Sequence, residues 1–247
     1  MTILHVADLH FQKPWYQWLE NSAPPHDLLV IAGDLLDLSH PAPHERQVRW
    51  VTDWLRDYPR PVSVCSGNHD LVWDSEHHVW WPARWLQSLK GTDRWVDGQS
   101  GALDGVSFLN LAASGRAHTR SADIWITHAP PLGPSVGWHK DGRAGSDAKL
   151  LYSVRNHRPS VVLCGHVHSP LSWIDRFEGT LYLNPGQDLA APFPNHVLID
   201  FTEGSVRRVR GKNGGIHQDV IIDLSGLPTP RPAVVAAAES EFALVGA

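Results

Sequence analysis

Five short motifs of aspartate, histidine and asparagine, each placed at the end of an apolar run, hold the residues most suited to chemistry. The motifs are Asp8-Leu9-His10, Gly33-Asp34-Leu35-Leu36-Asp37, Gly67-Asn68-His69-Asp70, Thr127-His128 and Gly165-His166-Val167-His168. Carboxylate, imidazole and amide ligands without thiolates suit divalent ions of intermediate hardness, namely Mn, Fe, Zn, Co or Ni. Burying such groups without a partner would cost several kcal/mol each. We therefore predict that they form a two-metal hydrolytic centre.

The apolar runs that precede the motifs predict a layered α/β fold. Most of these runs are continuous rather than alternating, which is typical of strands covered on both faces. The loops that follow such strands gather the ligand site, and the motifs fall in these loops. The expected strands are Ile3–Ala7, Leu28–Ala32, Val62–Cys65, Val106–Leu111, Ile124–Thr127, Val161–Cys164, Leu181–Leu183, His196–Phe201 and Val206–Val209, with Val220–Leu224 as a further candidate.

Helical periodicity fills two of the intervals between strands. Residues His44–Arg56 and Ser146–Asn156 each place apolar side chains on one stripe, and Ser146 is positioned to cap the second helix. We expect one domain over residues 1–225. From 226 to 247 the sequence turns to proline and then alanine, which predicts a poorly ordered tail.

Composition and charge restrict the partners of the chain. A formal net charge of −5 argues against a protein that coats long nucleic acid through its phosphates. No apolar run reaches the roughly 18 residues of a membrane span, and the chain enters a strand without a signal-like segment. Two cysteines imply no disulfide framework. We expect a cytoplasmic protein that acts on a small molecule, with neither membrane nor long nucleic acid as partner.

The order of the five motifs resembles the pattern of the calcineurin-like metallophosphoesterase superfamily, which reads D-x-H, G-D-x-x-D, G-N-H-D/E, H and G-H-x-H. The turn Asn184-Pro185-Gly186 is also similar to one that this family carries beyond its last motif. The stretch Thr127-His128-Ala129-Pro130-Pro131-Leu132-Gly133 looks like a subgroup of small stand-alone phosphodiesterases. The resemblance implies a four-layer α/β/β/α sandwich that hydrolyses small nucleotide-type or cyclic phosphodiesters.

The resemblance also implies two ligand sets. These are Asp8, His10, Asp34 and His168 for the first metal, and Asp34, Asn68, His128 and His166 for the second. Asp34 would bridge the two ions, of which manganese is the favoured choice. Two such cations polarise phosphoryl oxygens and lower the pKa of a bridging water, whose hydroxide would attack phosphorus in line.

Two catalytic residues follow from the same resemblance. His69 would assist the leaving oxygen, either as general acid or as hydrogen-bond donor, and Asp70 would orient its imidazole. Asp37 stands where the distantly related purple acid phosphatases have a tyrosine. We expect Asp37 to lie just outside the ligands or to cap the following turn.

Several residues outside the motifs are candidates for holding the substrate. Aromatic rings could stack a nucleobase, and cations could hold a second phosphate. Ordinary packing or surface exposure is the alternative for each of them. The candidates are Trp73, Arg116, His118, Trp138 and His139.

Two further groups have simpler explanations. We expect Trp80, Trp81 and Trp85 to pack in the core. The densest basic run is predicted to protect an edge strand by its charge; it consists of Arg207, Arg208, Arg210 and Lys212.

Three other functions are compatible with parts of this pattern. A phosphomonoesterase, acting on small metabolites or on phosphoproteins, would use the same metals, because the shape of the loops makes that choice. A nuclease is disfavoured by the acidic balance of the chain. An inert interaction module is disfavoured because no ligand and no acid residue is missing from the five motifs.

Overall fold

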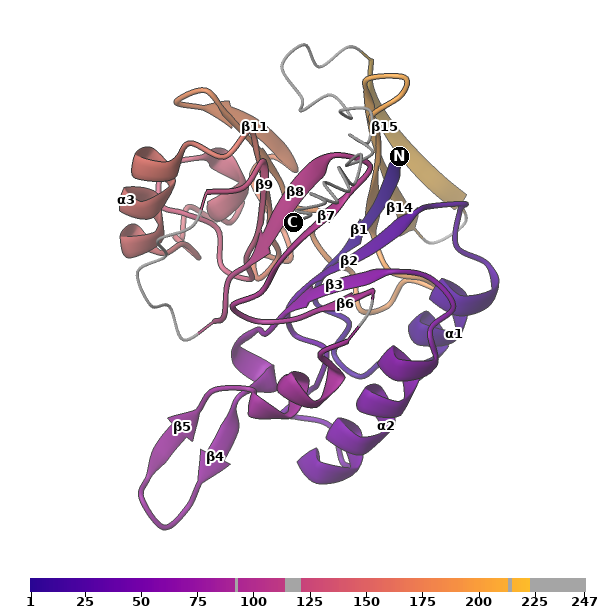
Figure 1. Cartoon of the computed structure of the whole chain (residues 1–247), viewed down its shortest axis with the longest axis vertical. Coiled ribbons are helices and arrows are strands. Elements are labelled where there is room, and N and C mark those ends of the chain that lie inside the picture. Colours follow the sequence, from indigo (N-terminus) through magenta and orange to yellow (C-terminus); the bar gives the residue numbers. More distant parts are fainter. Residues whose placement is uncertain (92, 114–120, 213–214, 223–247) are drawn as a thin grey trace, which may run out of the picture.

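The computed structural model describes residues 1–91, 93–113, 121–212 and 215–222 (Figure 1). One group of strands comprises β1 (Thr2–Val6), β2 (Leu28–Ala32), β3 (Val62–Cys65), β6 (Arg94–Trp95), β13 (His196–Asp200), β14 (Ser205–Lys212) and β15 (Gly215–Ile222). A second group comprises β7 (Ser100–Leu103), β8 (Val106–Asn110), β9 (Ile124–Ile126), β10 (Val161–Leu163), β11 (Ile174–Phe177) and β12 (Thr180–Leu183). The first group forms a sheet in the order β15-β14-β13-β1-β2-β3-β6, and the second forms a sheet in the order β11-β12-β10-β9-β8-β7.

In the described part of the chain, three α-helices cover the outer faces of the two sheets. Helices α1 (Lys13–Asn21) and α2 (His44–Asp57) lie against the first sheet, and α3 (Ala148–His157) lies against the second (Figure 1). Short 3₁₀ turns span Asn68–Asp70, Arg84–Leu89 and Ser135–Gly137. A two-stranded hairpin of β4 (Val72–Asp74) and β5 (Val79–Trp81) projects from the body of the molecule (Figure 1).

Three apolar clusters join these layers. One lies between the sheets and contains Ile3 and Val30 from the first sheet and Ile124 and Leu163 from the second. Another packs α1 and α2 on the first sheet, and the third packs α3 on the second. The fold is therefore an α/β/β/α sandwich, and the four-layer prediction is confirmed.

The direction of the central strands brings the motifs together. Strands β1, β2 and β3 are parallel neighbours, and β8, β9, β10 and β12 are parallel neighbours in the second sheet. The carboxyl ends of parallel strands lie at the same edge of a sheet. Because the two sheets are packed face to face, the loops from both edges meet at one end of the sandwich.

Several local predictions are wrong for identifiable reasons. Asp147, and not Ser146, caps α3, since its side chain accepts from Lys149 N. The basic run does not protect an edge, because β14 lies between β13 and β15. Trp80 and Trp81 are 48% and 42% exposed, since their hairpin stands outside both sheets.

The other predictions differ in outcome: one is confirmed, some elements were not predicted, and one prediction concerns residues that the structure does not describe. Trp85 packs against the core of the first sheet, as expected. Helix α1 and strands β4, β5, β6, β7 and β11 were not predicted. The proline- and alanine-rich tail, residues 226–247, lies outside the described residues. Within the described part of the chain, no helix combines the length and apolar character of a membrane span.

His196 makes the stability of the fold depend on pH. It is buried, its ring packs on Trp18 at 5.0 Å between centroids, and Nδ1 donates to Pro194 O at 3.0 Å. Burial lowers the pKa of His196 from 6.5 to about 4. As the pH falls below 6.5 the unfolded chain takes up this proton first, so stability is lost progressively down to about pH 4.

We therefore expect His196→Gln to weaken the pH dependence of unfolding. Between about pH 7.5 and about pH 5 this histidine should cost the wild type about 2 kcal/mol, because one pKa unit corresponds to about 1.4 kcal/mol. Urea unfolding of both metal-free proteins at the two pH values measures the difference. Equal losses in the two proteins would contradict the assignment.

Candidate metal centre

The loops that carry the motifs are fixed to one another by their backbones. Asp8 N donates to Gly33 O at 3.0 Å, and His10 N donates to Asp34 O at 2.9 Å. Asp8, His10, Asp34 and His166 all adopt positive φ, between 42° and 66°. Such backbone costs about 1–3 kcal/mol per residue and gathers at functional sites. The strained backbone positions are therefore those whose side chains form the candidate site.

Two motif glycines are required by close approach. A Cβ on Gly67 would lie 2.1 Å from Asp34 Oδ1, and a Cβ on Gly165 would lie 2.8 Å from Asp8 Oδ2. Both distances are shorter than any stable contact. These glycines therefore allow each carboxylate to lie directly against the backbone of another motif.

Gly67→Ala should consequently displace Asp34 and disrupt the site. Gly67 has an ordinary φ of −108°, so the effect would be steric alone. We expect metal affinity to fall at least tenfold, the loss typical when support of a ligand is removed. Metal titration measures it against Gly91→Ala, whose Cβ would meet its nearest atom at 3.9 Å. Equal affinities in the two variants would contradict this account.

The side chains of three motif residues meet around His128. Its Nδ1 donates to Ala32 O at 2.9 Å, so Nε2 carries a lone pair in the neutral ring. That nitrogen lies 3.0 Å from Asn68 Oδ1, 3.2 Å from Asp34 Oδ2 and 3.2 Å from His166 Nδ1. Electron-rich atoms packed this closely require a positive charge between them, either a proton or a metal ion. The donor set fits a divalent cation.

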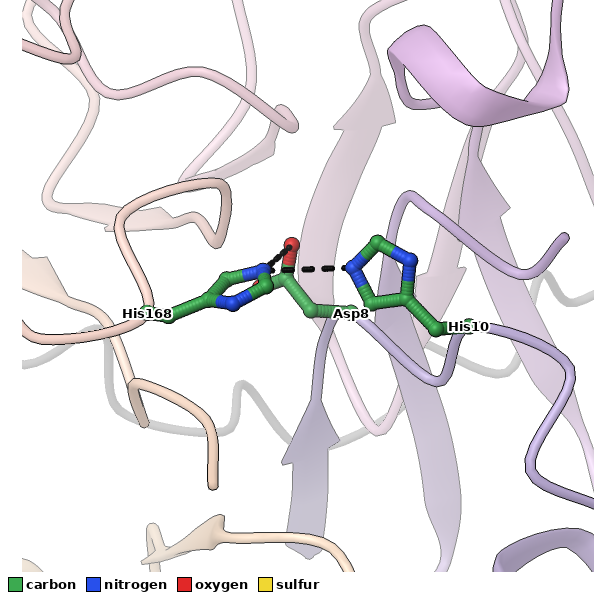
Figure 2. Close-up of side chains that lie close together, drawn as sticks. All are labelled: Asp8, His10 and His168. Atoms are coloured by element: carbon green, nitrogen blue, oxygen red, sulfur yellow. Dashed lines mark hydrogen bonds and ion pairs between the residues drawn. The ribbon is translucent and has the colours of Figure 1, made fainter. Parts of the chain in front are cut away.

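Figure 2 shows a second cluster, formed by Asp8, His10 and His168. His10 and His168 point their Nε2 atoms at each other across 3.2 Å, and His168 Nε2 lies 3.5 Å from Asp8 Oδ1. Asp8 is fully buried, and both of its oxygens also accept from His166 N, at 3.0 and 3.1 Å. Two facing imidazole nitrogens and a carboxylate are again a donor set that fits a divalent cation.

Asp34 lies between the two clusters. Its Oδ2 is 3.8 Å from His10 Nε2 and 3.2 Å from His128 Nε2. Burial favours the neutral acid, yet the charge and hydrogen bond of His128 hold the pKa of Asp34 below its usual range. Burial likewise opposes the charged form of His128, but Asp34 raises the pKa of that imidazole to about 10. The two groups thus favour a positive charge between them, which the proton of His128 supplies and which a cation bound to the neutral imidazole would replace.

The structure does not give Asp70 its expected role. Its two carboxylate oxygens accept from Leu36 N at 2.9 Å and Gly67 N at 2.7 Å, so Asp70 fixes two motif loops rather than the ring of His69. Burial and the charge of Asp34 raise the pKa of Asp70 to about 8.

The backbone of Leu38 and the side chain of Asp37, rather than Asp70, lie beside the ring of His69. His69 Nδ1 accepts from Leu38 N at 3.2 Å and lies 3.7 Å from Asp37 Oδ1. Asp37 also caps the following turn by accepting from Ser39 N at 2.8 Å, which is one of its two expected roles. His69 is partly exposed beside His10, with 4.6 Å between the ring centroids.

Two supporting residues escaped the sequence reasoning. Asn184 is buried, and its amide nitrogen donates to Gly165 O at 3.0 Å and Val167 O at 3.1 Å. Gln187 donates to Ala7 O at 3.1 Å and Asp8 O at 3.2 Å. Both belong to or follow the Asn-Pro-Gly turn, which was the only signal in the sequence for this support.

Among the described residues, two cavities lie against the centre. One of about 520 Å³ is lined in part by Asn68, His128 and His166, and one of about 550 Å³ is lined in part by His168.

None of the predicted substrate residues that the structure describes lines either cavity. Trp73 is exposed on the β4–β5 hairpin, where it contacts Trp80. Trp138 and His139 lie in a loop and pair there with Ala144 and Pro170. Arg116 and His118 lie outside the described residues.

This chain is similar to solved structures from other organisms. TT1561 of Thermus thermophilus is 11% identical, with a TM-score of 0.51 over 89% of this chain and 98% of that one. YfcE, a phosphoesterase from E. coli, is 16% identical, with a TM-score of 0.44 over 90% of this chain and 100% of that one. No curated protein matches the chain.

The sequence profile of the calcineurin-like phosphoesterase family matches residues 1–170, a range that contains all five motifs and both clusters. Members of this family carry a binuclear centre of divalent metals, and the two donor clusters supply the groups that such a centre needs. The chain therefore belongs to the calcineurin-like phosphoesterases and is a metal-dependent phosphoester hydrolase.

Proposed function

We propose that this hydrolase is a phosphodiesterase that acts on small nucleotide-type or cyclic phosphodiesters. The observation that carries the proposal is that each donor cluster adjoins its own cavity, one at Asn68, His128 and His166 and the other at His168. A phosphorus atom held between the clusters would have room for an ester arm on each side. A diester has two such arms, whereas a monoester has one.

The donor clusters support a specific division of the ligands. Asp8, His10 and His168 would hold one ion. Asn68, His128 and His166, here called the His128 cluster, would hold the other, and Asp34 would reach both. When bound, two such cations polarise phosphoryl oxygens and lower the pKa of water toward neutrality. Asp8 and Asp34 are almost fully buried, which keeps solvent away from the inner side of the centre.

His69 is positioned to act on the leaving oxygen. Because its Nδ1 accepts from Leu38 N, the hydrogen of the neutral ring lies on Nε2. That N–H would donate to the oxygen on which charge develops as the ester bond breaks. Asn68 is exposed and His69 is partly exposed, so substrate would enter from this side.

The metal and the compartment belong to the same proposal. Oxygen and nitrogen donors without a thiolate suit manganese, and the described part of the chain contains two free, buried cysteines, Cys65 and Cys164. Both features are compatible with a manganese enzyme of the cytoplasm.

Turnover of bis-p-nitrophenyl phosphate and of p-nitrophenyl phosphate by the manganese-loaded protein tests the proposal. We expect kcat/KM for the diester to exceed that for the monoester at least tenfold. A preference for the monoester would show a phosphomonoesterase instead, with the same metals but with a pocket suited to a dianionic phosphate.

A further inference from the structure

The two cavities beside the centre differ in chemistry. Leu111, Ala112, Ala129 and Leu150 give the cavity at the His128 cluster mainly apolar walls, and the 71% exposed ring of Tyr152 lies at its rim. Apart from the histidines of the centre, its described residues that are charged at pH 7 are Asp147 and Lys149, which have opposite signs. Such a wall favours a neutral, planar group over an anion.

The cavity at His168 is cationic. Lys140, Arg208 and Arg210 line it, and Asp188 is the one acidic residue among the described lining residues. Asp188 Oδ1 also accepts from Ala190 N at 3.1 Å. Guanidinium and ammonium groups gathered in this way recognise phosphate or carboxylate oxygens.

Strand β14 places the two arginines in this cavity. Side chains alternate along a strand, so Arg208 and Arg210 share a face with Val206, which is buried in the core between the sheets. Arg207 lies on the opposite face. Because β14 is hydrogen-bonded to β13 along one edge and to β15 along the other, it is not an edge strand. Edge protection therefore does not explain these positive charges.

The loops around His168 are built to bring these cations close. Lys140 N donates to Ser169 O at 3.2 Å. Gly186 has a positive φ of 63°, and a Cβ there would lie 2.8 Å from His168 O and 3.1 Å from an Nη atom of Arg208. The absence of a side chain at position 186 thus lets the guanidinium lie beside the loop that carries His168.

A buried polar atom in the same wall also points to a ligand. Asn195 lines the cavity and is 4% exposed, and its Oδ1 has no hydrogen-bond partner among the described residues. Buried acceptors are nearly always paired. A hydroxyl group on a bound molecule would satisfy this oxygen.

We propose that the substrate is an asymmetric phosphodiester, with one planar apolar arm in the cavity at the His128 cluster and a second arm that carries a further anionic group in the cavity at His168. A dinucleotide with a terminal phosphate has this chemistry. The inference rests on the proposed phosphodiesterase function, because both cavities are assigned relative to a diester held between the clusters.

Two dinucleotides test the inference in the manganese-loaded protein: adenylyl-adenosine with a 5′-terminal phosphate and the same molecule without it. We expect kcat/KM to be at least tenfold higher for the phosphorylated form, as charge-assisted contacts to the added phosphate predict. In the double variant Lys140→Gln, Arg210→Gln this ratio should fall to about one. Arg207→Gln, on the other face of β14, should keep it. Ala112→Trp, which fills the apolar cavity, should raise KM for both substrates.

The outcomes separate this inference from the function on which it rests. Equal kcat/KM for the two dinucleotides, or an unchanged ratio in the double variant, would overturn the anionic site. A general structural defect in the double variant would lower both rates equally, so it could not by itself bring the ratio down to one. Hydrolysis of bis-p-nitrophenyl phosphate without hydrolysis of either dinucleotide would overturn the substrate class alone. If bis-p-nitrophenyl phosphate is also stable, the phosphodiesterase function itself is wrong.

Discussion

Asp34→Asn is expected to lower phosphodiester turnover on the order of a thousandfold and to reduce bound metal from two ions per chain to one or none. The carboxylate of Asp34 lies within 4 Å of a histidine nitrogen in each cluster, His10 on one side and His128 on the other. An amide offers a metal ion one neutral ligand oxygen, whereas the carboxylate offers two oxygens that share a negative charge. Losing charge stabilisation at a reacting centre typically costs about 10²–10³ in rate, and loss of an ion adds to this.

Elemental analysis and turnover of bis-p-nitrophenyl phosphate, measured on the same preparation, check this result. Asp123→Asn is the matched control. Asp123 directly precedes β9, whereas His128 lies beyond the other end of this strand, and the Asp123 carboxylate accepts hydrogen bonds from Ser107 N and Oγ. The control should retain both metals and activity. Two metals and near-normal turnover in Asp34→Asn would show that this carboxylate does not connect the clusters.

His69→Ala is expected to lower turnover of esters with poor leaving groups by about 10²–10⁴ while metal content stays normal. Removing a positioned proton donor has effects of this size. Esters of p-nitrophenol should lose much less, because that leaving group departs with little assistance. Comparing a p-nitrophenyl ester with a nucleoside ester, alongside metal analysis, separates the two effects.

The proximity of His69 to the cluster of Asp8, His10 and His168 makes the metal analysis decisive. His69, His10 and Asp34 place ligand-type atoms within 4.8 Å of one another. His77→Ala, on the exposed hairpin, provides the control for loss of a histidine. If His69→Ala loses an ion, or slows both kinds of ester equally, His69 is a ligand or a structural residue and not the proton donor.

The position of the centre could be predicted because its information is local. Each motif follows a continuous apolar run, and parallel packing carries such loops to one end of the sandwich. The motif glycines encode part of the geometry as well. Gly67 and Gly165 stand where a Cβ would collide with Asp34 and Asp8.

The parts of the site that could not be predicted depend on contacts between segments that lie far apart in the sequence. Asp70 follows His69 directly, but its buried carboxylate is taken up by Leu36 N and Gly67 N. The sequence of β14 does not reveal that β15 pairs along its whole length. Only that pairing shows that Arg208 and Arg210 are not edge charges. Gly186, in the turn Asn184–Gln187, lies beside both His168 and Arg208, and the sequence does not reveal this proximity either.

The central claim is that turnover requires two metal ions held by the two clusters. Metal-stripped protein titrated with Mn²⁺, with bound metal counted at each step, tests it most directly. We predict that hydrolysis of bis-p-nitrophenyl phosphate rises to its maximum as occupancy reaches two ions per chain, and that both ions are lost or weakened in Asp34→Asn. Full activity at one ion per chain, or full occupancy without hydrolysis, would contradict the account.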